Sequence, residues 1–186
     1  QAIDFAPRVS GECFISETRH GPMAHARLGI AEENSGKLVT LVRKRASQLA
    51  VERGCGLVVI DGPPGIGCPV IASIGGTSLV LIVTEPTVSG LHDMERVAQL
   101  AAHFKTPAMI CINKSDLNRE LAATMRARAE AMGLRTAGEI AYDPVMTRAQ
   151  IAGQSVIEFD RGSRVAVEVA KSWTTVLGAL ETLNHV

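Results

Sequence analysis

The sequence predicts an α/β fold in which helices cover both faces of a mostly parallel sheet. The first observation behind this prediction is that short aliphatic runs alternate with helically spaced segments from about residue 55 onward. Such alternation requires right-handed crossovers and a sheet with two covered faces. The second observation is composition, because 46% of the 186 residues are hydrophobic and only 3% are aromatic. We therefore expect residues 1–186 to form one domain with an aliphatic core.

Eight elements of this fold are expected from the pattern of apolar residues. The four predicted strands cover residues 57–61, 79–84, 108–113 and 137–142. The four predicted helices cover residues 35–53, 90–104, 118–132 and 162–183. Ser35 is the expected N-cap of the first helix, Thr87 or Ser89 caps the second, and Gly133 ends the third. Two short runs, residues 13–16 and 23–28, are expected as strands before the first helix.

The balance of charge excludes two classes of partner. The chain has 19 Lys and Arg residues and 19 Asp and Glu residues, which gives a formal net charge of zero. A neutral chain has no general electrostatic attraction for nucleic acid or for a membrane surface. No apolar run approaches the roughly 20 residues of a transmembrane helix. We therefore expect neither a nucleic-acid partner nor a membrane span.

The cysteines predict a reducing compartment. They are widely spaced and form no C-x-x-C pair. This arrangement is typical of free thiols in the cytoplasm, where we expect the protein to work. It is insufficient for a complete metal site within this chain. The four thiols are those of Cys13, Cys55, Cys68 and Cys111.

A candidate nucleotide site follows the first predicted strand. Asp61 stands at the carboxyl-terminal end of four apolar residues, where open α/β sheets bind ligands. A carboxylate there typically holds Mg²⁺ through water, and the glycine amides after it can face a phosphate. The segment therefore has the form of a Walker B acid with its switch loop, and Asp61 is the catalytic and metal-site candidate. The loop residues expected to contact nucleotide are Gly62, Pro63, Pro64, Gly65 and Gly67.

A candidate base-recognition segment follows the third predicted strand, with the sequence Asn113-Lys114-Ser115-Asp116. The Asn113 amide can donate to and accept from a purine edge, and the Lys114 stem can cover the face of the purine. The tetrad also matches the N-K-x-D pattern of GTPases, in which the Asp accepts from guanine N–H groups. The structural alternative is a loop with an Asn/Asp turn. We expect Asn113, Lys114 and Asp116 to contact nucleotide.

The second predicted strand ends in Glu85-Pro86-Thr87, which is a further candidate segment. Pro86 stops the strand, and Thr87 can start the following helix. Glu85 and Thr87 are expected at the same sheet edge as Asp61, where they would contact the switch loop or the metal shell. The alternative is a strand-to-helix turn that needs no ligand.

The fourth predicted strand ends in Tyr142-Asp143. A long side chain at this position overhangs the crevice and can approach the base or the ribose. The alternative is the start of a helix at Pro144. We include Tyr142 and Asp143 among the expected nucleotide contacts.

One Gly-Lys pair in the chain does not form a P-loop. Gly36-Lys37 precedes a predicted helix, but the motif G-x-x-x-x-G-K-[ST] requires glycine where Ala31 stands. It also requires a hydroxyl residue, which binds Mg²⁺, where Leu38 stands. These 186 residues therefore contain no Walker A motif.

Taken in order, these motifs resemble the MinD/ParA superfamily of P-loop ATPases. The resemblance is strongest to the subgroup with an inserted ferredoxin domain, often grouped with cobyrinic acid a,c-diamide synthase-type nucleotide-binding domains. It implies a P-loop NTPase-like fold lacking the Walker A strand. It also implies Mg²⁺ near Asp61, a switch loop over residues 62–67 that senses the γ-phosphate, and an adenine contact by Asn113. The stretches that carry the resemblance are residues 21–28, 32–39, 61–69, 85–90, 113–116 and 142–143.

The same resemblance implies a larger parent protein. In the subgroup, the Walker A strand and loop come first, then a ferredoxin-like insert with two [4Fe–4S] clusters, and then the segment found here. Gln1 is therefore expected to be an internal point of the parent, just after the insert. ATP and Mg²⁺ are expected cofactors of the full-length parent, and the clusters belong to the insert rather than to this chain. The expected partners are the parent's ferredoxin domain and an unknown client protein.

The missing Walker A motif changes what we expect of this chain by itself. Phosphate positioning supplies most of the catalysis in phosphoryl transfer, so we expect no activity from the chain alone. The resemblance places the Walker A strand centrally, beside the Walker B strand, and its removal exposes two apolar strand edges. We therefore expect a rearranged sheet or a strand-mediated homodimer. The alternative functions are a GTPase and a non-catalytic protein-interaction module. Pro64 stands against the GTPase, because the D-x-x-G motif needs glycine there.

Overall fold

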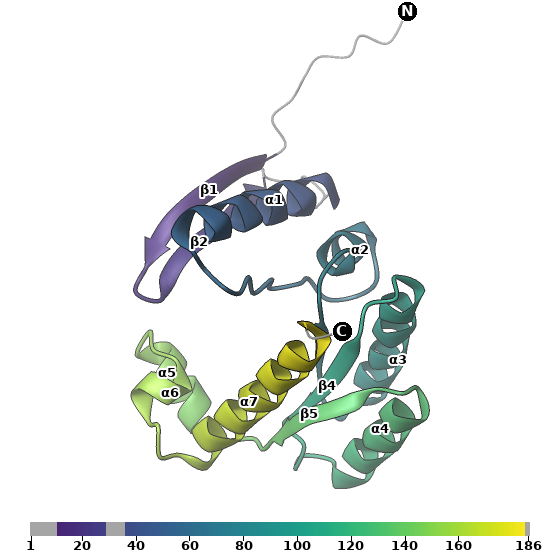
Figure 1. The fold of residues 1–186 in the computed structure, drawn as a ribbon. Helices are drawn as coiled ribbons and strands as arrows, with labels where there is room; N and C mark the ends of the chain where they lie inside the picture. The colour runs from purple at the N-terminus through teal and green to yellow at the C-terminus, as the bar shows by residue number, and fades with distance from the viewer. Residues whose placement is uncertain (1–10, 29–35, 185–186) are drawn as a thin grey trace, which may run out of the picture. The chain divides into compact units, whose positions relative to one another are not determined.

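The computed structural model describes residues 11–28 and 36–184 (Figure 1). The chain divides into two compact units, Gln1–Gly75 and Gly76–Val186. The expectation of one domain over residues 1–186 stays a prediction. Within the described ranges, no helix is long and apolar enough to cross a bilayer.

The first unit contains a β-hairpin and two helices. Strands β1 (Gly11–Thr18) and β2 (Gly21–Leu28) pair antiparallel, which confirms both short strands expected from the sequence. Gly21 closes the hairpin turn with a φ of 125°, a conformation that favours glycine. The helices are α1 (Gly36–Arg53) and α2 (Cys68–Ile74). Ser35, the predicted cap of α1, lies outside the described residues.

Helices α1 and α2 pack closely against each other. A β-carbon at Gly36 would lie 3.0 Å from the Cys68 carbonyl oxygen, so a larger residue would push the helices apart. The Arg43 guanidinium donates a hydrogen bond to the Ala72 carbonyl. At the other end of α1, Arg53 lies 2.6 Å from a carboxylate oxygen of Glu17 in β1.

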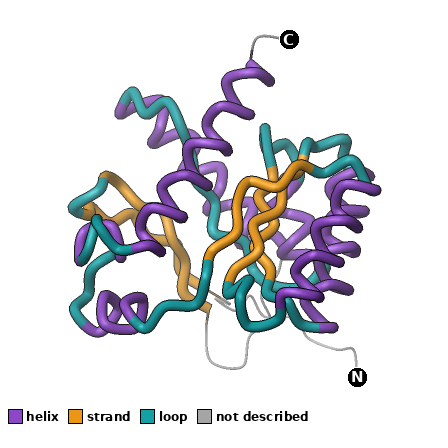
Figure 2. The backbone as a smooth tube through the Cα atoms, turned by 90° about the horizontal axis from the view of Figure 1, so that it is seen from below, coloured by secondary structure: helices purple, strands orange, loops and turns teal. Residues whose placement is uncertain are grey.

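The second unit is built on a parallel sheet with the strand order β3–β4–β5, drawn in orange in Figure 2. Strands β3 (Val80–Thr84) and β4 (Ala108–Asn113) confirm two predicted strands. Strand β5 (Arg135–Ile140) begins and ends two residues before the predicted range of 137–142. The helices of this unit are α3 (Val88–His103), α4 (Arg119–Ala131), α5 (Val145–Ile151), α6 (Val156–Phe159) and α7 (Arg164–Asn184).

Side-chain capping sets the helix starts that the sequence predicted. The Thr87 hydroxyl accepts from the Gly90 amide and begins α3. The Asn118 side chain accepts from the Leu121 amide at 3.0 Å and begins α4. After α4, Gly133 adopts a φ of 77° and turns the chain back toward β5. The short helices α2 and α6 were not predicted as elements, because seven residues or fewer carry little periodicity, and for α5 the sequence left open a helix start at Pro144.

Helices cover both faces of the sheet. On one face, Ile110 and Ile112 of β4 pack with Met94 of α3 and Met125 of α4, and each is at most 1% exposed. On the other face, Met109 and its neighbours pack against α7. Burying an aliphatic side chain of this size typically contributes about 1.5–3 kcal/mol. The structure therefore confirms the predicted fold class.

Helix α7 lies unusually close to the backbone of β5. A β-carbon at Gly138 would lie only 1.9 Å from the Ser172 hydroxyl oxygen and 2.9 Å from its β-carbon. Cys111 of β4 pairs in register with Gly138, and burial raises the pKa of its thiol. Glycine at position 138 therefore permits the close packing of this face.

The prediction of a strand over residues 57–61 is wrong. Leu57 is 44% exposed and Val59 is 72% exposed, and no described strand pairs with this segment. A strand needs a neighbour to bond its N–H and C=O groups, which apolar composition alone does not provide. In the MinD/ParA superfamily, which the sequence resembles, the strand that pairs with the Walker B strand is the Walker A strand. Asp61 therefore follows an exposed, unpaired segment rather than a strand.

Candidate functional site

The carboxyl ends of the three parallel strands bring three predicted site segments, residues 85–87, 113–116 and 142–143, to one sheet edge or its continuation. Strand β4 pairs with β3 at Ile112 and Thr84, and with β5 at Asn113 and Ile140. The residues that follow therefore start at one edge, which is the ligand-binding edge of open α/β sheets. This edge of the second unit holds the predicted residues Glu85, Pro86, Thr87, Asn113, Lys114, Asp116, Tyr142 and Asp143.

Lys114 connects the segment after β4 to the segment after β3. Its ammonium lies 2.7 Å from Oε1 of Glu85, and the two side chains are 38% and 43% exposed. Lys114 has a φ of 52°, in the left-handed region that residues with a β-carbon rarely occupy. The ammonium is therefore paired with Glu85 in this structure.

Ser115 and Asp116 connect the same segment to the end of β5. The Ser115 amide donates to the Ile140 carbonyl at 3.0 Å, and the Tyr142 amide donates to Asp116 Oδ1 at 2.7 Å. The hydrogen bond from the Tyr142 amide lowers the pKa of the Asp116 carboxyl. Three consecutive residues thus reach both neighbouring strand ends. We call this set the strand-end frame; it consists of Glu85, residues 114–116, Ile140 and Tyr142.

Two side chains at this edge are available to a ligand. Among the described residues, no hydrogen bond engages the side-chain amide of Asn113, which is half-buried at the end of β4. Tyr142, the sole tyrosine of the chain, is 50% exposed. An amide both donates and accepts hydrogen bonds, and an aromatic ring provides a flat apolar surface. The edge can therefore recognise a planar ligand with a polar rim, such as a nucleotide base.

Helix α7 contributes two residues that the sequence analysis did not single out. Glu168 Oε2 accepts from the Ala141 amide at 2.8 Å, and Glu168 Oε1 lies 2.7 Å from Arg164 Nε. The hydrogen bond to Glu168 raises the pKa of Arg164. The i,i+4 spacing of Arg164 and Glu168 predicts their pairing, but nothing in the sequence predicts the bond to Ala141.

Asp143 has a local structural role. Its Oδ1 accepts from the Val145 amide at 2.8 Å, which satisfies a free N–H group at the start of α5. The helix that begins after Pro144 is the structural alternative that the sequence left open.

The segment after β3 is a closely packed helix start. Thr87 Oγ1 accepts from the Gly90 amide at 2.9 Å. A β-carbon at Gly90 would lie 2.3 Å from the Glu85 carbonyl oxygen, so α3 can approach this backbone only with glycine there. Pro86 is buried, and the Thr87 hydroxyl is engaged in the cap. Of these predicted residues, Glu85 presents its charged group at the edge, where Lys114 pairs with it.

The Asp61 loop belongs to the first unit and leads into α2. Asp61, Gly62 and Pro64 are exposed, and Gly65 has a φ of 89°. The Gly67 carbonyl accepts from the Val70 amide at 2.9 Å in the first turn of α2. Across the described residues, no group of three His, Cys, Asp or Glu residues can hold a metal ion. One exposed carboxylate fits a water-mediated contact to Mg²⁺, in which phosphates and water supply the other ligands.

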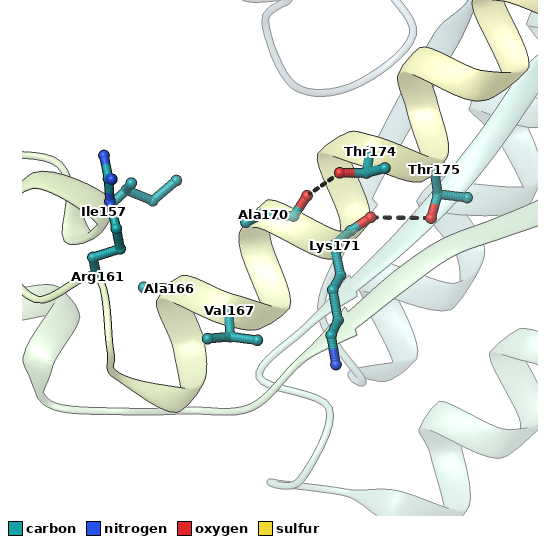
Figure 3. Close-up of a pocket in the computed structure, with 8 residues that line it drawn as sticks. All are labelled: Ile157, Arg161, Ala166, Val167, Ala170, Lys171, Thr174 and Thr175. Atoms are coloured by element: carbon teal, nitrogen blue, oxygen red, sulfur yellow. Dashed lines mark hydrogen bonds between the residues drawn. The ribbon is translucent and has the colours of Figure 1, made fainter.

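A separate hollow is lined by α6, the turn after it and α7 (Figure 3). Its surface is mostly apolar, and Arg161 and Lys171 supply its charges. The Thr174 and Thr175 hydroxyls turn back to helix carbonyls, as the dashed lines in Figure 3 show. None of the lining residues belongs to the strand-end frame, so this hollow is not part of the candidate site.

Among known proteins, no family model matches the chain. It is similar to two uncharacterized proteins of Methanocaldococcus jannaschii. The identity to MJ0578 is 33% over 97 residues, which cover 52% of this chain and 34% of that protein. The identity to MJ0579 is 25% over 112 residues, which cover 60% of this chain and 40% of that protein. The chain thus spans well under half the length of the curated relatives that it matches.

Solved structures with a similar fold are cell-division and ParA-family ATPases. The Aquifex aeolicus MinD protein superposes with a TM-score of 0.64 at 14% identity, over 88% of this chain and 68% of that one. The Pyrococcus furiosus cell division ATPase MinD gives 0.62 at 16% identity, over 78% and 59%. A ParA family ATPase from Chlorobium tepidum TLS gives 0.58 at 17% identity, over 77% and 57%. The chain therefore has the α/β fold of MinD/ParA-type P-loop ATPases.

Proposed function

We propose that this chain is the C-terminal part of an iron–sulfur-associated, MinD/ParA-like ATPase, and that it supplies the part of the nucleotide crevice that contacts the base. The observation that carries the proposal is the strand-end frame. Its hydrogen bonds and ion pair fix three loops at the ligand-binding edge while the Asn113 amide remains available. Because these loops are already held in place, little conformational entropy is lost in ordering them when a ligand binds.

The frame favours ATP over GTP. An N-K-x-D motif recognises guanine through an Asp carboxylate that accepts from neighbouring guanine N–H groups. Here one oxygen of Asp116 already accepts from the Tyr142 amide at 2.7 Å, and the ammonium of Lys114 is paired with Glu85. Pro64 stands where a GTPase D-x-x-G motif needs glycine. GTP is therefore the rival nucleotide and ATP the proposed one.

In the parent protein, Asp61 contacts Mg²⁺ through water, and residues 62–67 face the γ-phosphate. When bound, Mg²⁺ neutralises the charge that develops on the phosphates. These 186 residues contain no Walker A motif, so the parent must position the phosphates with another segment. We therefore propose that this chain alone is inactive. The [4Fe–4S] clusters lie in the parent's ferredoxin domain, and nucleotide binding in the cytoplasm couples to that domain or to a client protein.

The edge of β3 that faces away from β4, with which no described strand pairs, is the proposed site of strand pairing. Val80–Thr84 contains no charged residue, and Val83 is 61% exposed. The opposite edge strand, β5, carries Arg135 and Glu139, and charged residues are a common protection of natural sheet edges. We propose that the Walker A strand covers β3 in the parent and that the isolated chain forms a strand-mediated homodimer. Sedimentation analysis should then find a dimer that Val83→Lys dissociates, and a monomeric wild-type chain would contradict it.

Calorimetry on the parent protein tests the nucleotide assignment. We expect Mg–ATP to bind and GTP to bind at least about tenfold more weakly, which is about 1.4 kcal/mol. Asn113→Ala should weaken ATP binding by about tenfold. Thr174→Ala, on the surface of α7, is the matched control and should leave affinity unchanged. Preference for GTP, or no effect of Asn113→Ala, would overturn the assignment.

A non-catalytic interaction module is the second candidate function. The exposed apolar residues Leu57, Val58 and Val59 favour it, because such segments commonly bind other chains. The two candidates make opposite predictions for the parent. ATP hydrolysis by the parent would exclude the interaction module, and a parent without any affinity for ATP would exclude the ATPase.

A further inference from the structure

We propose that Asp116 is a positioning residue for Tyr142, and that the Tyr142 ring is the stacking surface against which the Asn113 amide recognises an adenine-class base. This inference rests on the proposed nucleotide function. In this inference, Asp116 acts on the base only by holding Tyr142 in place. The N-K-x-D pattern suggests instead that Asp116 contacts the base directly.

The main chain after β5 is held by carboxylates at three positions, residues 141, 142 and 145. The Ala141 amide donates to Glu168 at 2.8 Å, and the Tyr142 amide donates to Asp116 at 2.7 Å. The Val145 amide donates to Asp143 at 2.8 Å. Hydrogen bonds to an ionised acceptor are roughly twice as strong as those between neutral groups. The backbone that carries the Tyr142 ring is therefore fixed before any ligand binds.

The Tyr142 ring is exposed where a ligand would bind. Asn113 pairs in register with Ile140, and Tyr142 follows Ile140 by two residues at the same sheet edge. Tyr142 is 50% exposed in a chain whose residues are only 3% aromatic. Aromatic rings stack on nucleotide bases, because every base presents a π-face. An exposed tyrosine with a fixed main chain, at the same sheet edge as an available amide, is suited to that contact.

Asp116 is the link on which this arrangement depends. One of its oxygens is engaged by the Tyr142 amide, and the preceding Ser115 amide donates to Ile140. Removing the Asp116 carboxylate leaves the Tyr142 amide without this hydrogen bond, while the ring and the Asn113 amide stay in the chain. Loss of Asp116 should therefore weaken base binding only when the Tyr142 ring is present.

A double-variant cycle on the 186-residue chain tests this dependence, with ATP as the probe and amide NMR shifts as the readout. We expect ATP to shift the amides of Asn113 and Tyr142. Asp116→Ala and Tyr142→Ala should each weaken binding about fivefold, and Asp116→Ala should add almost nothing in the Tyr142→Ala background. Tyr142→Phe keeps the ring and should bind like the wild type. Asp116→Asn keeps an acceptor oxygen and should restore most of the affinity.

Three outcomes would overturn the inference, and they are distinguishable. Additive losses for Asp116→Ala and Tyr142→Ala would show independent roles and would leave the proposed function intact. Tighter binding of GTP that Asp116→Asn abolishes would show a direct guanine contact. No ATP-dependent shift at Asn113 or Tyr142 would reject the base site itself. In that case, the Tyr142 amide shift in Asp116→Ala, measured without nucleotide, still reports whether the positioning hydrogen bond exists.

Discussion

Two aliphatic runs of similar composition differ in structure within this protein. Residues 57–60 are Leu-Val-Val-Ile, and residues 80–83 are Val-Leu-Ile-Val. The second run lies in β3, where it pairs with β4, and Ile82 is 7% exposed. The first run has no strand partner among the described residues, and Val59 is 72% exposed. The difference lies in the neighbours, because a strand is stabilised by cross-strand partners and a covered face more than by its own propensity.

The same difference separates two segments that the sequence predicted as site residues. The strand-end frame follows three paired strands, and hydrogen bonds between neighbouring loops fix it. The Asp61 loop follows the unpaired run and is exposed. The loops at the ends of the paired strands are therefore held by contacts within this chain, whereas the Asp61 loop has no paired strand before it among the described residues.

Truncating one buried and one unpaired residue should separate the two runs most clearly. Ile110 is 0% exposed in β4, so Ile110→Ala should lower the free energy of unfolding by about 3–4 kcal/mol. Val59→Ala should change it by less than about 0.5 kcal/mol, because Val59 is largely exposed. Urea denaturation measures both. Equal losses for the two variants would mean that residues 57–60 are packed in solution.

A pair of glycine variants extends the comparison to the backbone. Gly138→Ala should cost about 2 kcal/mol, because its β-carbon would lie 1.9 Å from the Ser172 hydroxyl oxygen. Gly56→Ala, next to the unpaired run, should cost almost nothing, since its β-carbon meets no atom within 4 Å. Thermal and urea unfolding measure both variants. Ser172→Gly should partly rescue Gly138→Ala, and the absence of rescue would argue against this contact.

Acid should weaken the paired region through Asp116. The folded state lowers the pKa of Asp116, so its contribution to stability is complete above the ordinary Asp value of about 3.9. That contribution is lost as the pH falls through the lowered pKa of the folded protein. Asp116→Asn should therefore flatten the acid limb of a stability–pH profile measured by urea unfolding below about pH 4. An unchanged acid limb would mean that the Tyr142 hydrogen bond does not persist in solution.

The ion pair between Lys114 and Glu85 should have the smallest effect. Because both side chains are more than a third exposed, Glu85→Gln should lower stability by less than about 1 kcal/mol. The loss should shrink in about 1 M salt, where the Debye length is about 3 Å. Lys114→Gln completes a double-mutant cycle that isolates the pair. A salt-independent coupling would indicate that the pair is shielded from solvent.

Much of the second unit was predictable from the sequence, because its signals are local. Apolar periodicity located β3, β4 and α3, and Thr87 was one of the two residues expected to cap α3. The tetrad at residues 113–116 was predictable as a site segment because it follows a strand in an α/β pattern. The partners of its side chains were not, since Glu85 and Tyr142 come from other strand ends.

The sequence by itself determined the α/β class and the order along the chain of the paired strands and the helices between them. It also determined that these residues contain no Walker A motif. These follow from the spacing of apolar and turn-forming residues along one chain. Only the tertiary structure decided that residues 57–60 remain unpaired and that Lys114 and Asp116 hold neighbouring loops. The physical reason is that strand pairing and side-chain hydrogen bonds depend on groups that are distant in sequence. A local sequence pattern shows which groups need a partner, but it does not show which partner each group finds.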